Sequence, residues 1–439
     1  MVKVTARKQL LRNGQGLISA LLLTIAVLWT ILAPVKATAA AVTLDLRQAY
    51  NQALEANNDI RIAAEDLEQA RLLKKQAITV LFPKLTATAG ASKQYFEDGT
   101  KLDNTTWGLR LNQTLYNGGR VWTAKRGAEI SFSAAEYGLN FAKQNILLSL
   151  LIRTYDVLAA EEFLVLVDKR IARVTEQLRS SQAKFKIGQV SKTDVLSARV
   201  ALTAAKRDRV VAQKDLLLAE KRLAQLLDVE GQVKVKQPPD VELIRFELDE
   251  YVLKARDNRP DLAQSVELVR FTEQEAKLVK AGGNPDIDLS ASYTQYSDQA
   301  LFVPERQVSL NFEWPFFQGG LVRLQTKEAF SKVRQSQEDH SKRLKAADLE
   351  VEVAFRELAS LEAQKDLVES SLANARENYR LARIQFDLGA ATDLDVLVAQ
   401  DGLAESENLA VNQRYNMRTA RAALLYSIGV LNMDVFKFD

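Results

Sequence analysis

A short motif that occurs twice in the sequence carries hydroxyl and carboxyl side chains at a regular spacing. The motif is a glycine, a hydroxyl residue three positions later and an aspartate three positions after that, in the copies Gly188, Ser191, Asp194 and Gly389, Thr392, Asp395. A serine or threonine three residues before a carboxylate is typical of a capping box at a helix start, here with Asp in place of Glu. The two aspartates could serve the helix start alone, or could also face a pore. The sequence leaves both interpretations open.

The chain offers few groups for catalysis. It has no cysteine, which excludes disulfides, thiolate metal sites and a lipid-modified cysteine at the N-terminus. Its one histidine, His340, stands in a charged helical stretch, where we expect a solvated helix residue. Because general bases and metal ligands are so scarce, we expect no enzymatic activity, no metal site and no cofactor.

The sequence is internally duplicated. Glycine landmarks recur 201 positions later, in the pairs Gly118 and Gly319, Gly119 and Gly320, and Gly188 and Gly389. Upstream, Pro83 and Pro285 are 202 positions apart, so the copies differ in length by one residue, which a loop tip could absorb. Two copies of one supersecondary unit predict a single shared core.

A long helical hairpin dominates each repeat. With 8 Pro and 18 Gly in 439 residues, the composition predicts mostly long helices. A long helix follows each glycine pair and a shorter one returns after Gly188 or Gly389, so we expect hairpins over 120–227 and 321–430. Apolar residues spaced three and four apart along both arms predict antiparallel coiled coils, in which frequent alanines let the backbones approach closely.

One β-hairpin precedes each long helix. Apolar and polar residues alternate over about 84–95 and 105–116 in the first repeat, and over about 286–296 and 306–316 in the second. Strands of about ten residues fit a tilted membrane crossing, although a two-faced hairpin also suits the edge of a soluble sandwich. Four strands per chain would leave open edges that only other copies of the chain could close. We therefore expect two transmembrane β-hairpins.

The N-terminus has the pattern of an export signal. Basic residues precede an apolar run from Leu17 to Ala33, and Ala37 and Ala39 offer a small-x-small cleavage site. An uncleaved membrane anchor is the alternative, because the run approaches spanning length. Five of the 59 Lys and Arg residues lie in this leader, which leaves 54 against 56 Asp and Glu. The chain without its leader would be slightly acidic, so we expect no nucleic-acid partner.

These patterns divide the chain into five expected segments. They are a signal peptide at 1–39, a first structural repeat at 40–230, a linker at 231–245, a second repeat at 246–432 and a tail at 433–439. The expected fold class is mainly α with β: duplicated coiled-coil hairpins with two transmembrane β-hairpins.

The order of these elements resembles the TolC family of outer-membrane channel proteins. The resemblance covers nearly the whole chain from Leu44 to Leu431, and includes the strand-ending Gly-Gly pairs and the Gly-x5-Asp-Val-Leu tips. It implies a homotrimer whose chains build a twelve-stranded β-barrel in outer-membrane lipid. An α-helical tunnel would continue the barrel through the periplasm of a Gram-negative type envelope, and the linker would belong to an equatorial belt.

The resemblance also implies protein partners. Members of the family dock a periplasmic adaptor and an inner-membrane pump, of the resistance-nodulation-division or ABC type. Because the adaptor engages the tips, docking is implied for the residues that build these turns, namely Lys184, Lys186, Gly188, Ser191, Lys192, Gly389 and Thr392.

An acidic ring at the closed periplasmic end is a further implication. Asp395 matches the first of the two ring aspartates of the family, with Asp393 beside it and Asp194 as its counterpart in the first tip. Val398 stands at the second ring position, and Ala391 stands where the family has an arginine of its closing network. The resemblance therefore implies at most a single acidic ring in this chain, at Asp395.

The resulting prediction is a passive outer-membrane exit duct of a tripartite efflux or type I secretion system, gated at the periplasmic tips. A periplasmic adaptor protein and a coiled-coil envelope scaffold are the alternatives, because both also present long helical hairpins. The cargo and the cognate pump are not encoded in this chain.

Overall fold

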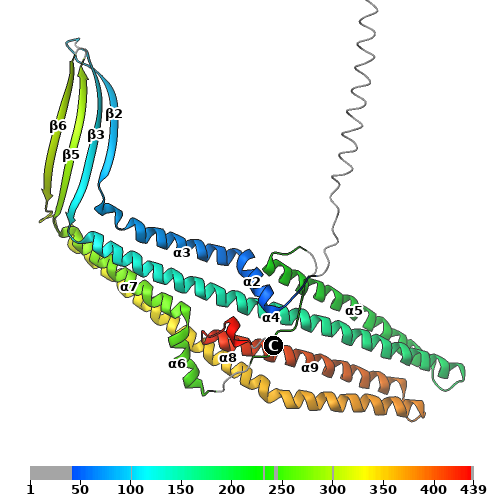
Figure 1. Ribbon diagram of the computed structural model, residues 1–439. Coiled ribbons are helices and arrows are strands. Elements are labelled where there is room, and N and C mark those ends of the chain that lie inside the picture. Colours follow the sequence, from blue (N-terminus) through cyan, green and yellow to red (C-terminus); the bar gives the residue numbers. More distant parts are fainter. Residues whose placement is uncertain (1–41, 100, 231–232, 242–245, 299–300, 437–439) are drawn as a thin grey trace, which may run out of the picture. The chain divides into compact units, whose positions relative to one another are not determined.

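The computed structural model describes residues 42–99, 101–230, 233–241, 246–298 and 301–436 (Figure 1). The expected signal peptide at 1–39 lies outside this part of the chain. One compact unit contains Thr43–Val229 and Val233–Asp439. A second unit contains Met1–Val42 and Glu230–Gln232, and only Val42 and Glu230 of it are among the described residues.

Two long helical hairpins form the largest part of the structure (Figure 1). The first pairs α4 (Arg120–Lys186) with α5 (Lys192–Leu227), and the second pairs α8 (Leu321–Asp387) with α9 (Asp393–Ser427). Each long arm has 67 residues and would extend about 100 Å at 1.5 Å per residue. Alanines such as Ala198 and Ala205 are fully buried in the seam between α4 and α5, so the backbones approach closely.

Shorter helices pack beside the upper parts of the long arms. Helix α3 (Asn58–Gln76) packs on α4, α4 on α7 (Pro260–Lys280), and α7 on α8, so these four helices lie side by side (Figure 1). Pro260 stands at the first turn of α7, where its missing N–H costs nothing. Among the described residues, none of the helices combines the length and apolar character needed to cross a membrane.

The remaining short elements lie around these helices. The Leu44 carbonyl accepts a hydrogen bond from the Lys236 N–H at 2.9 Å, next to the two-stranded pairing of β1 and β4. The bounds are β1 Val42–Leu44, α2 Leu46–Ala56, η1 Thr79–Leu81, β4 Val233–Val235, α6 Leu248–Asn258, η2 Ala281–Gly283 and η3 Met433–Val435.

A four-stranded antiparallel sheet projects from the ends of the helices (Figure 1). Its order is β2 (Lys84–Tyr95), β3 (Lys101–Asn117), β5 (Asp286–Asp298) and β6 (Leu301–Glu313). Each repeat contributes one hairpin, and the pairing of β3 with β5 joins the two repeats. Strands β2 and β6 are therefore the two edges of this sheet.

Two strand bounds differ from the sequence expectation. Strand β3 begins at Lys101 instead of 105, because Lys101–Asn104 pair with Ser92–Tyr95 although their side chains no longer alternate in polarity. Strand β6 covers Leu301–Glu313 instead of 306–316. It ends before Trp314 and Pro315, because proline has no N–H to donate to a ladder. Alternating side-chain polarity shows only where the two faces of a strand have different surroundings, whereas backbone pairing with the neighbouring strand can continue beyond that point.

One hydrophobic core contains residues of both repeats. Leu147 and Leu150 of α4 are fully buried in the same cluster as Leu424 of α9 and Leu431. The expected repeats at 40–230 and 246–432 therefore pack on each other through this cluster. His340 also differs from its expected solvated state, because its Nδ1 lies 2.7 Å from the Oγ of buried Ser265 on α7.

Candidate functional site

The strand register divides the sheet into a polar and an apolar face. Lys84, Asn112, Ser290 and Ser309 are successive partners across the four strands, and they share one face because partnered residues point the same way. The next residues along form the row Leu85, Leu111, Ala291 and Val308 on the opposite face. Contact with water is therefore favourable for the polar face and unfavourable for the apolar face.

The apolar face is exposed in the isolated chain. Val308 is 76% exposed, and most of the large apolar side chains of this face are also exposed, including Leu85, Leu109, Leu310 and Phe312. The apolar positions of β2 run from Leu85 to Ala91, a length of about 20 Å along the strand. This approaches the apolar band of about 25 Å of transmembrane barrels. An exposed patch of this kind indicates a lipid or protein neighbour.

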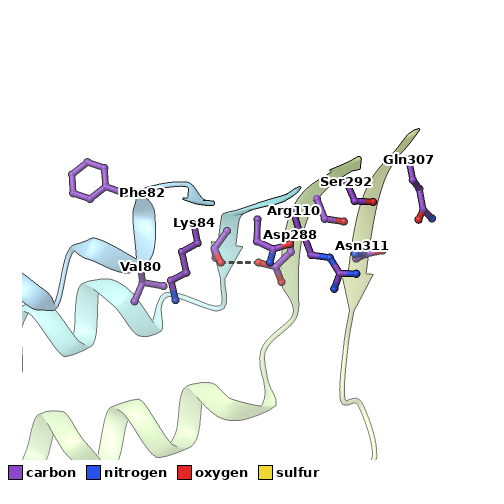
Figure 2. A pocket seen from close by; sticks show the side chains of 11 residues that line it. Val80, Phe82, Lys84, Arg110, Asp288, Ser292, Gln307 and Asn311 are labelled. Atoms are coloured by element: carbon purple, nitrogen blue, oxygen red, sulfur yellow. Dashed lines mark hydrogen bonds between the residues drawn. The ribbon is translucent and has the colours of Figure 1, made fainter. Parts of the chain in front are cut away.

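The polar face carries a half-open pocket of about 440 Å³ near the helical end of the sheet (Figure 2). Lys84, Arg110 and Asp288 bring charges of both signs to its lining. The Thr114 hydroxyl donates a hydrogen bond to Asp288 Oδ1 at 2.7 Å. No group of three or more His, Cys, Asp and Glu in the described part of the chain could hold a metal ion. The lining suits passage or transient contact of polar solutes.

The expected glycine turns join the strands to the long helices. Gly118 and Gly119 have φ values of 64° and 79°, and Gly319 and Gly320 have 60° and 85°. Side chains disfavour this left-handed region, so glycine is needed there. At Gly118 a Cβ would also lie 2.5 Å from Asn284 Cβ, and Asn284 donates a hydrogen bond to the Gly118 carbonyl at 2.8 Å.

Both tips have the geometry that the motif predicts. Gly188 and Gly389 close the long helices with φ of 74° and 77°. Thr392 and Asp395 then form a reciprocal capping box on α9, as Ser191 and Asp194 do on α5. Hydrogen bonds from the hydroxyl and the N–H of Thr392 lower the pKa of Asp395 from its usual 3.8. The stabilisation by this carboxylate is therefore present above pH 3.8 and is lost as the pH falls through the lowered pKa.

Asp393 is buried between the two hairpins instead of facing solvent. It is 1% exposed, and its Oδ1 accepts hydrogen bonds of 2.5 Å from Gln177 Nε2 and from Ser181 Oγ, both on α4. Its Oδ2 is also buried and has no hydrogen-bond partner among the described residues. The carboxylate thus links the start of α9 to the end of α4. We call this contact the tip latch (Gln177, Ser181 and Asp393).

Lys184 is also engaged within the chain. Its Nζ donates a hydrogen bond to the Phe386 carbonyl, lies 3.7 Å from the centroid of the Phe386 ring and is 3.9 Å from Asp387 Oδ1. It therefore joins the ends of α4 and α8. By contrast, Lys186 and Lys192 are exposed at the first tip.

Ion pairs continue the contact between α4 and α9 above the tip latch. Arg173 pairs with Glu407 at 2.8 Å, and both side chains are mostly buried. Arg170 bridges three helices, because its guanidinium contacts Asp208 of α5 at 3.0 Å and Asp401 of α9 at 2.7 Å. These pairs fix α9 against the first hairpin.

The sequence profile described as "Outer membrane efflux protein" matches residues 49–228 and 252–430, which is most of the chain and both repeats. The chain belongs to the outer membrane efflux protein family. It is therefore a channel protein of the outer membrane with a periplasmic extension, in a family that is not enzymatic. The family assignment also excludes the adaptor and scaffold alternatives.

Two TolC proteins are similar to most of this chain. Outer membrane protein TolC of Salmonella enteritidis is 23% identical over 410 residues, which cover 88% of this chain and 82% of the relative. The TolC protein of Vibrio cholerae serotype O1 is 24% identical over 424 residues, which cover 89% of this chain and 93% of the relative. Homologues of this type form trimers and work with efflux systems.

Solved structures show the same fold. CusC superposes with a TM-score of 0.79 at 18% identity, over 88% of this chain and 92% of CusC. The CmeC outer membrane channel of Campylobacter jejuni gives a TM-score of 0.75 at 19% identity, over 88% of this chain and 85% of CmeC. The open state of the Neisseria gonorrhoeae MtrE outer membrane channel gives 0.74 at 19% identity, over 88% and 89%.

The sequence did not predict the hydrogen-bond partners of Asp393. Gln177 and Ser181 lie more than 200 positions before Asp393, and neither stands in a recognisable motif. One signal was present: Ser181 occupies a seam position where the pattern favours an apolar residue. A polar residue in such a seam indicates a buried hydrogen bond.

Proposed function

We propose that three copies of this chain close a twelve-stranded barrel in the outer membrane and form a passive exit duct. The observation that carries this proposal is the four-stranded sheet with two unpaired edges, one polar face and one exposed apolar face. Unpaired backbone groups are too costly in a bilayer, so the edges β2 and β6 must pair with strands from elsewhere. Pairing β6 of one copy with β2 of the next satisfies both edges.

The polar face then lines an aqueous lumen. Lys84, Arg110 and Asp288 would face this lumen, while Leu85 and Val308 would contact lipid. The long hairpins would continue the lumen into the periplasm, with 231–245 in a surrounding belt. Because the lumen would carry charges of both signs, the lining provides no strong selection by charge, and selection of cargo would rest on the pump.

The gate would lie at the tips, where the structure concentrates polar contacts. A periplasmic adaptor and an inner-membrane pump of the resistance-nodulation-division or ABC type would provide the energy for opening. Such partners shift the equilibrium only if they bind the open tip more tightly than the closed one. The duct would thus serve a tripartite efflux or type I secretion system.

Asp395 and Asp194 are the remaining candidates for an acidic ring, because Asp393 is buried whereas Asp395 is exposed and Asp194 is partly exposed. The Oδ2 of Asp395 caps α9, which leaves its Oδ1 free to face a lumen in the trimer. The ring predicts that divalent cations reduce the conductance of the wild-type channel in planar bilayers and act weakly on Asp395→Asn. Equal block of both proteins would show that Asp395 is only a helix cap.

Export assays test the function through the exposed tip lysines. We expect Lys186→Glu to reduce export several-fold, because reversing a charge that meets a partner adds repulsion to the docking step. Lys365→Glu, which reverses an exposed lysine of α8 far from the tip, is the matched control. Both variants should reach the outer membrane in equal amounts. Normal export by Lys186→Glu would contradict docking at the first tip.

A further inference from the structure

We propose that a pocket between α3, α4 and α7 binds small aromatic cations, with Glu275 as the counter-charge. The three helices lie side by side next to the sheet (Figure 1). The pocket has a volume of about 390 Å³, within the range of about 300–1,000 Å³ that is usual for small-molecule sites. Three helices of a single chain form it, so the pocket does not depend on the proposed trimer. Its effect on transport, however, rests on the proposed duct.

The lining of this pocket is mostly apolar. Phe271 provides an aromatic ring, and Leu73 and Leu278 provide aliphatic side chains. Leu73 is 52% exposed, so the pocket is open to an approaching solute. Gln76 and Gln274 add side-chain amides that can donate or accept hydrogen bonds. Apolar walls with a few polar groups are typical of sites for small organic molecules.

Small residues of α4 create the space for a ligand. Ala124, Gly127 and Ser131 line the pocket from one face of this helix, because they are spaced by three and four residues. The internal duplication provides a comparison within the same chain. The counterparts of these residues on α8, 201 positions later, are Gln325, Glu328 and Lys332. The second repeat therefore lacks the small residues that open the pocket, and we expect one site per chain.

One carboxylate determines which charge the pocket prefers. Glu275 is the one charged residue of the lining, and its side chain has no ion pair or hydrogen bond within the described part of the chain. Lys74 does not neutralise it, because the Lys74 ammonium lies 5.5 Å from the centroid of the Phe132 ring. A carboxylate near the Phe271 ring favours a cation with aromatic groups, since charge attraction and ring contacts then act together. A phospholipid fits less well, because its phosphate would repel the carboxylate.

We place the opening of the pocket on the lumen side of the proposed duct. Ala77 of the lining is three residues before Val80, which lines the pocket on the polar face of the sheet. Trp122 is 58% exposed and lies about 200° around α4 from Ala124, on the other side of this helix. Tryptophan side chains are enriched at membrane–water interfaces, so this other side suits the outer surface of the duct. A cation in the pocket would therefore lie beside the path of exported solutes.

Binding of ethidium, an aromatic cation whose fluorescence rises in apolar surroundings, tests the site in the protein extracted from the outer membrane with detergent. After subtraction of the dye bound by detergent alone, we expect saturable binding of one dye per chain. Glu275→Gln should weaken this binding roughly five-fold, because an exposed charge pair contributes modestly. Glu273→Gln is the matched control, since it removes a carboxylate from the opposite side of α7 and should bind like the wild-type protein. Phenanthridine, an uncharged relative of the dye, should bind Glu275→Gln and the wild-type protein equally.

Ala124→Leu tests the same pocket through its shape. The larger side chain would extend into open space, so the fold should be kept, and ethidium binding should fall about ten-fold because the rings lose their room. Equal binding by Ala124→Leu and the wild-type protein would overturn this pocket as the site. Equal binding by Glu275→Gln and the wild-type protein would overturn the preference for cations. A trimer without saturable binding would overturn the inference as a whole, because detergent, lipid or a neighbouring chain would then fill the pocket.

Conductance in planar bilayers separates the pocket from the duct. Ethidium is expected to reduce the conductance of the wild-type channel, and Ala124→Leu should need more dye for the same block, in proportion to its loss of binding. Binding without any block would overturn the placement on the lumen side. Equal block of both proteins would also overturn it, because the dye would then act at another site. A protein that binds ethidium through Glu275 and forms no channel would overturn the proposed duct and leave the binding site intact.

Discussion

Asp393→Ala is expected to convert the closed tip into a leaking one. The substitution removes the carboxylate that accepts hydrogen bonds from Gln177 and Ser181. It leaves the buried Gln177 amide without this acceptor, whereas the Ser181 hydroxyl still donates to the Gln177 carbonyl at 3.0 Å. Unpaired buried groups of this kind cost about 1–3 kcal/mol. A loss of about 2 kcal/mol per chain corresponds to a roughly 30-fold shift toward the undocked tip. The effect should be larger in a trimer, which has three such contacts.

The leak is measured as entry of a hydrophilic dye into cells that lack the pump and adaptor. Asp393→Asn keeps an acceptor oxygen and is expected to leak less than Asp393→Ala. Asp401→Asn removes an exposed partner of Arg170 and should have a small effect, because exposed ion pairs contribute little. If Asp393→Ala is as tight as the wild-type protein, the tip latch does not hold the gate closed.

Arg259→Ala is expected to have the largest effect on stability. Arg259 is 5% exposed and pairs with Asp261 at 2.8 Å and Glu350 at 2.6 Å. Burial alone would lower its pKa, but the hydrogen bonds that Arg259 donates to these carboxylates outweigh burial and raise it, so the guanidinium is charged in the fold. Removing one partner of a buried pair costs about 3–5 kcal/mol, because the carboxylate of Asp261 keeps the desolvation penalty.

The position of Arg259 strengthens this expectation. Its Nη1 also donates a hydrogen bond to the Ser427 carbonyl at 3.2 Å, at the end of α9. Gly429 follows with φ of 76°, and a Cβ there would lie 2.7 Å from the Arg259 backbone nitrogen. The arginine therefore joins the start of α7 to the chain reversal after α9. Gly429→Ala should destabilise the same junction through a steric clash.

Thermal unfolding followed by helical circular dichroism measures the effect. Arg259→Ala should lower the midpoint by several degrees relative to Arg256→Ala, the matched control. Arg256 also forms a two-bond ion pair, with Asp348, but its side chain is 44% exposed. Similar midpoints for the two variants would show that the Arg259 pairs do not stabilise the junction.

Local chemistry made part of the site predictable from the sequence. The capping boxes at Ser191 and Thr392 depend on residues three positions apart, and a hydroxyl before a carboxylate has few other uses at a helix start. The glycine turns between the strands and the long helices could also be predicted, because the Gly-Gly pairs recur in both repeats. The β-hairpins, the helical hairpins and their polar and apolar faces could be predicted from the spacing of apolar residues, because this spacing does not depend on tertiary contacts.

Contacts between the repeats could not be predicted in the same way. Periodicity shows which face of α9 is apolar, but it does not give the axial register at which α9 docks on α4. The sequence therefore suggested Asp393 as a companion of Asp395 in the ring, and only the structure shows that it is 1% exposed and hydrogen-bonded by Ser181. The contact of the Lys184 ammonium with the Phe386 carbonyl could not be predicted for the same reason. A single sequence predicts which face of each helix is apolar, and the structure shows which of these faces contact each other.

Each chain supplies a sheet with two unpaired edges, which other copies of the chain would close. This assembly can be measured by native mass spectrometry of the protein gently extracted from the outer membrane. We expect a particle with three times the mass of the mature chain, in which the strands resist proteolysis. A folded monomer that is stable in water without detergent, with residues 84–95 and 301–313 protected, would contradict it.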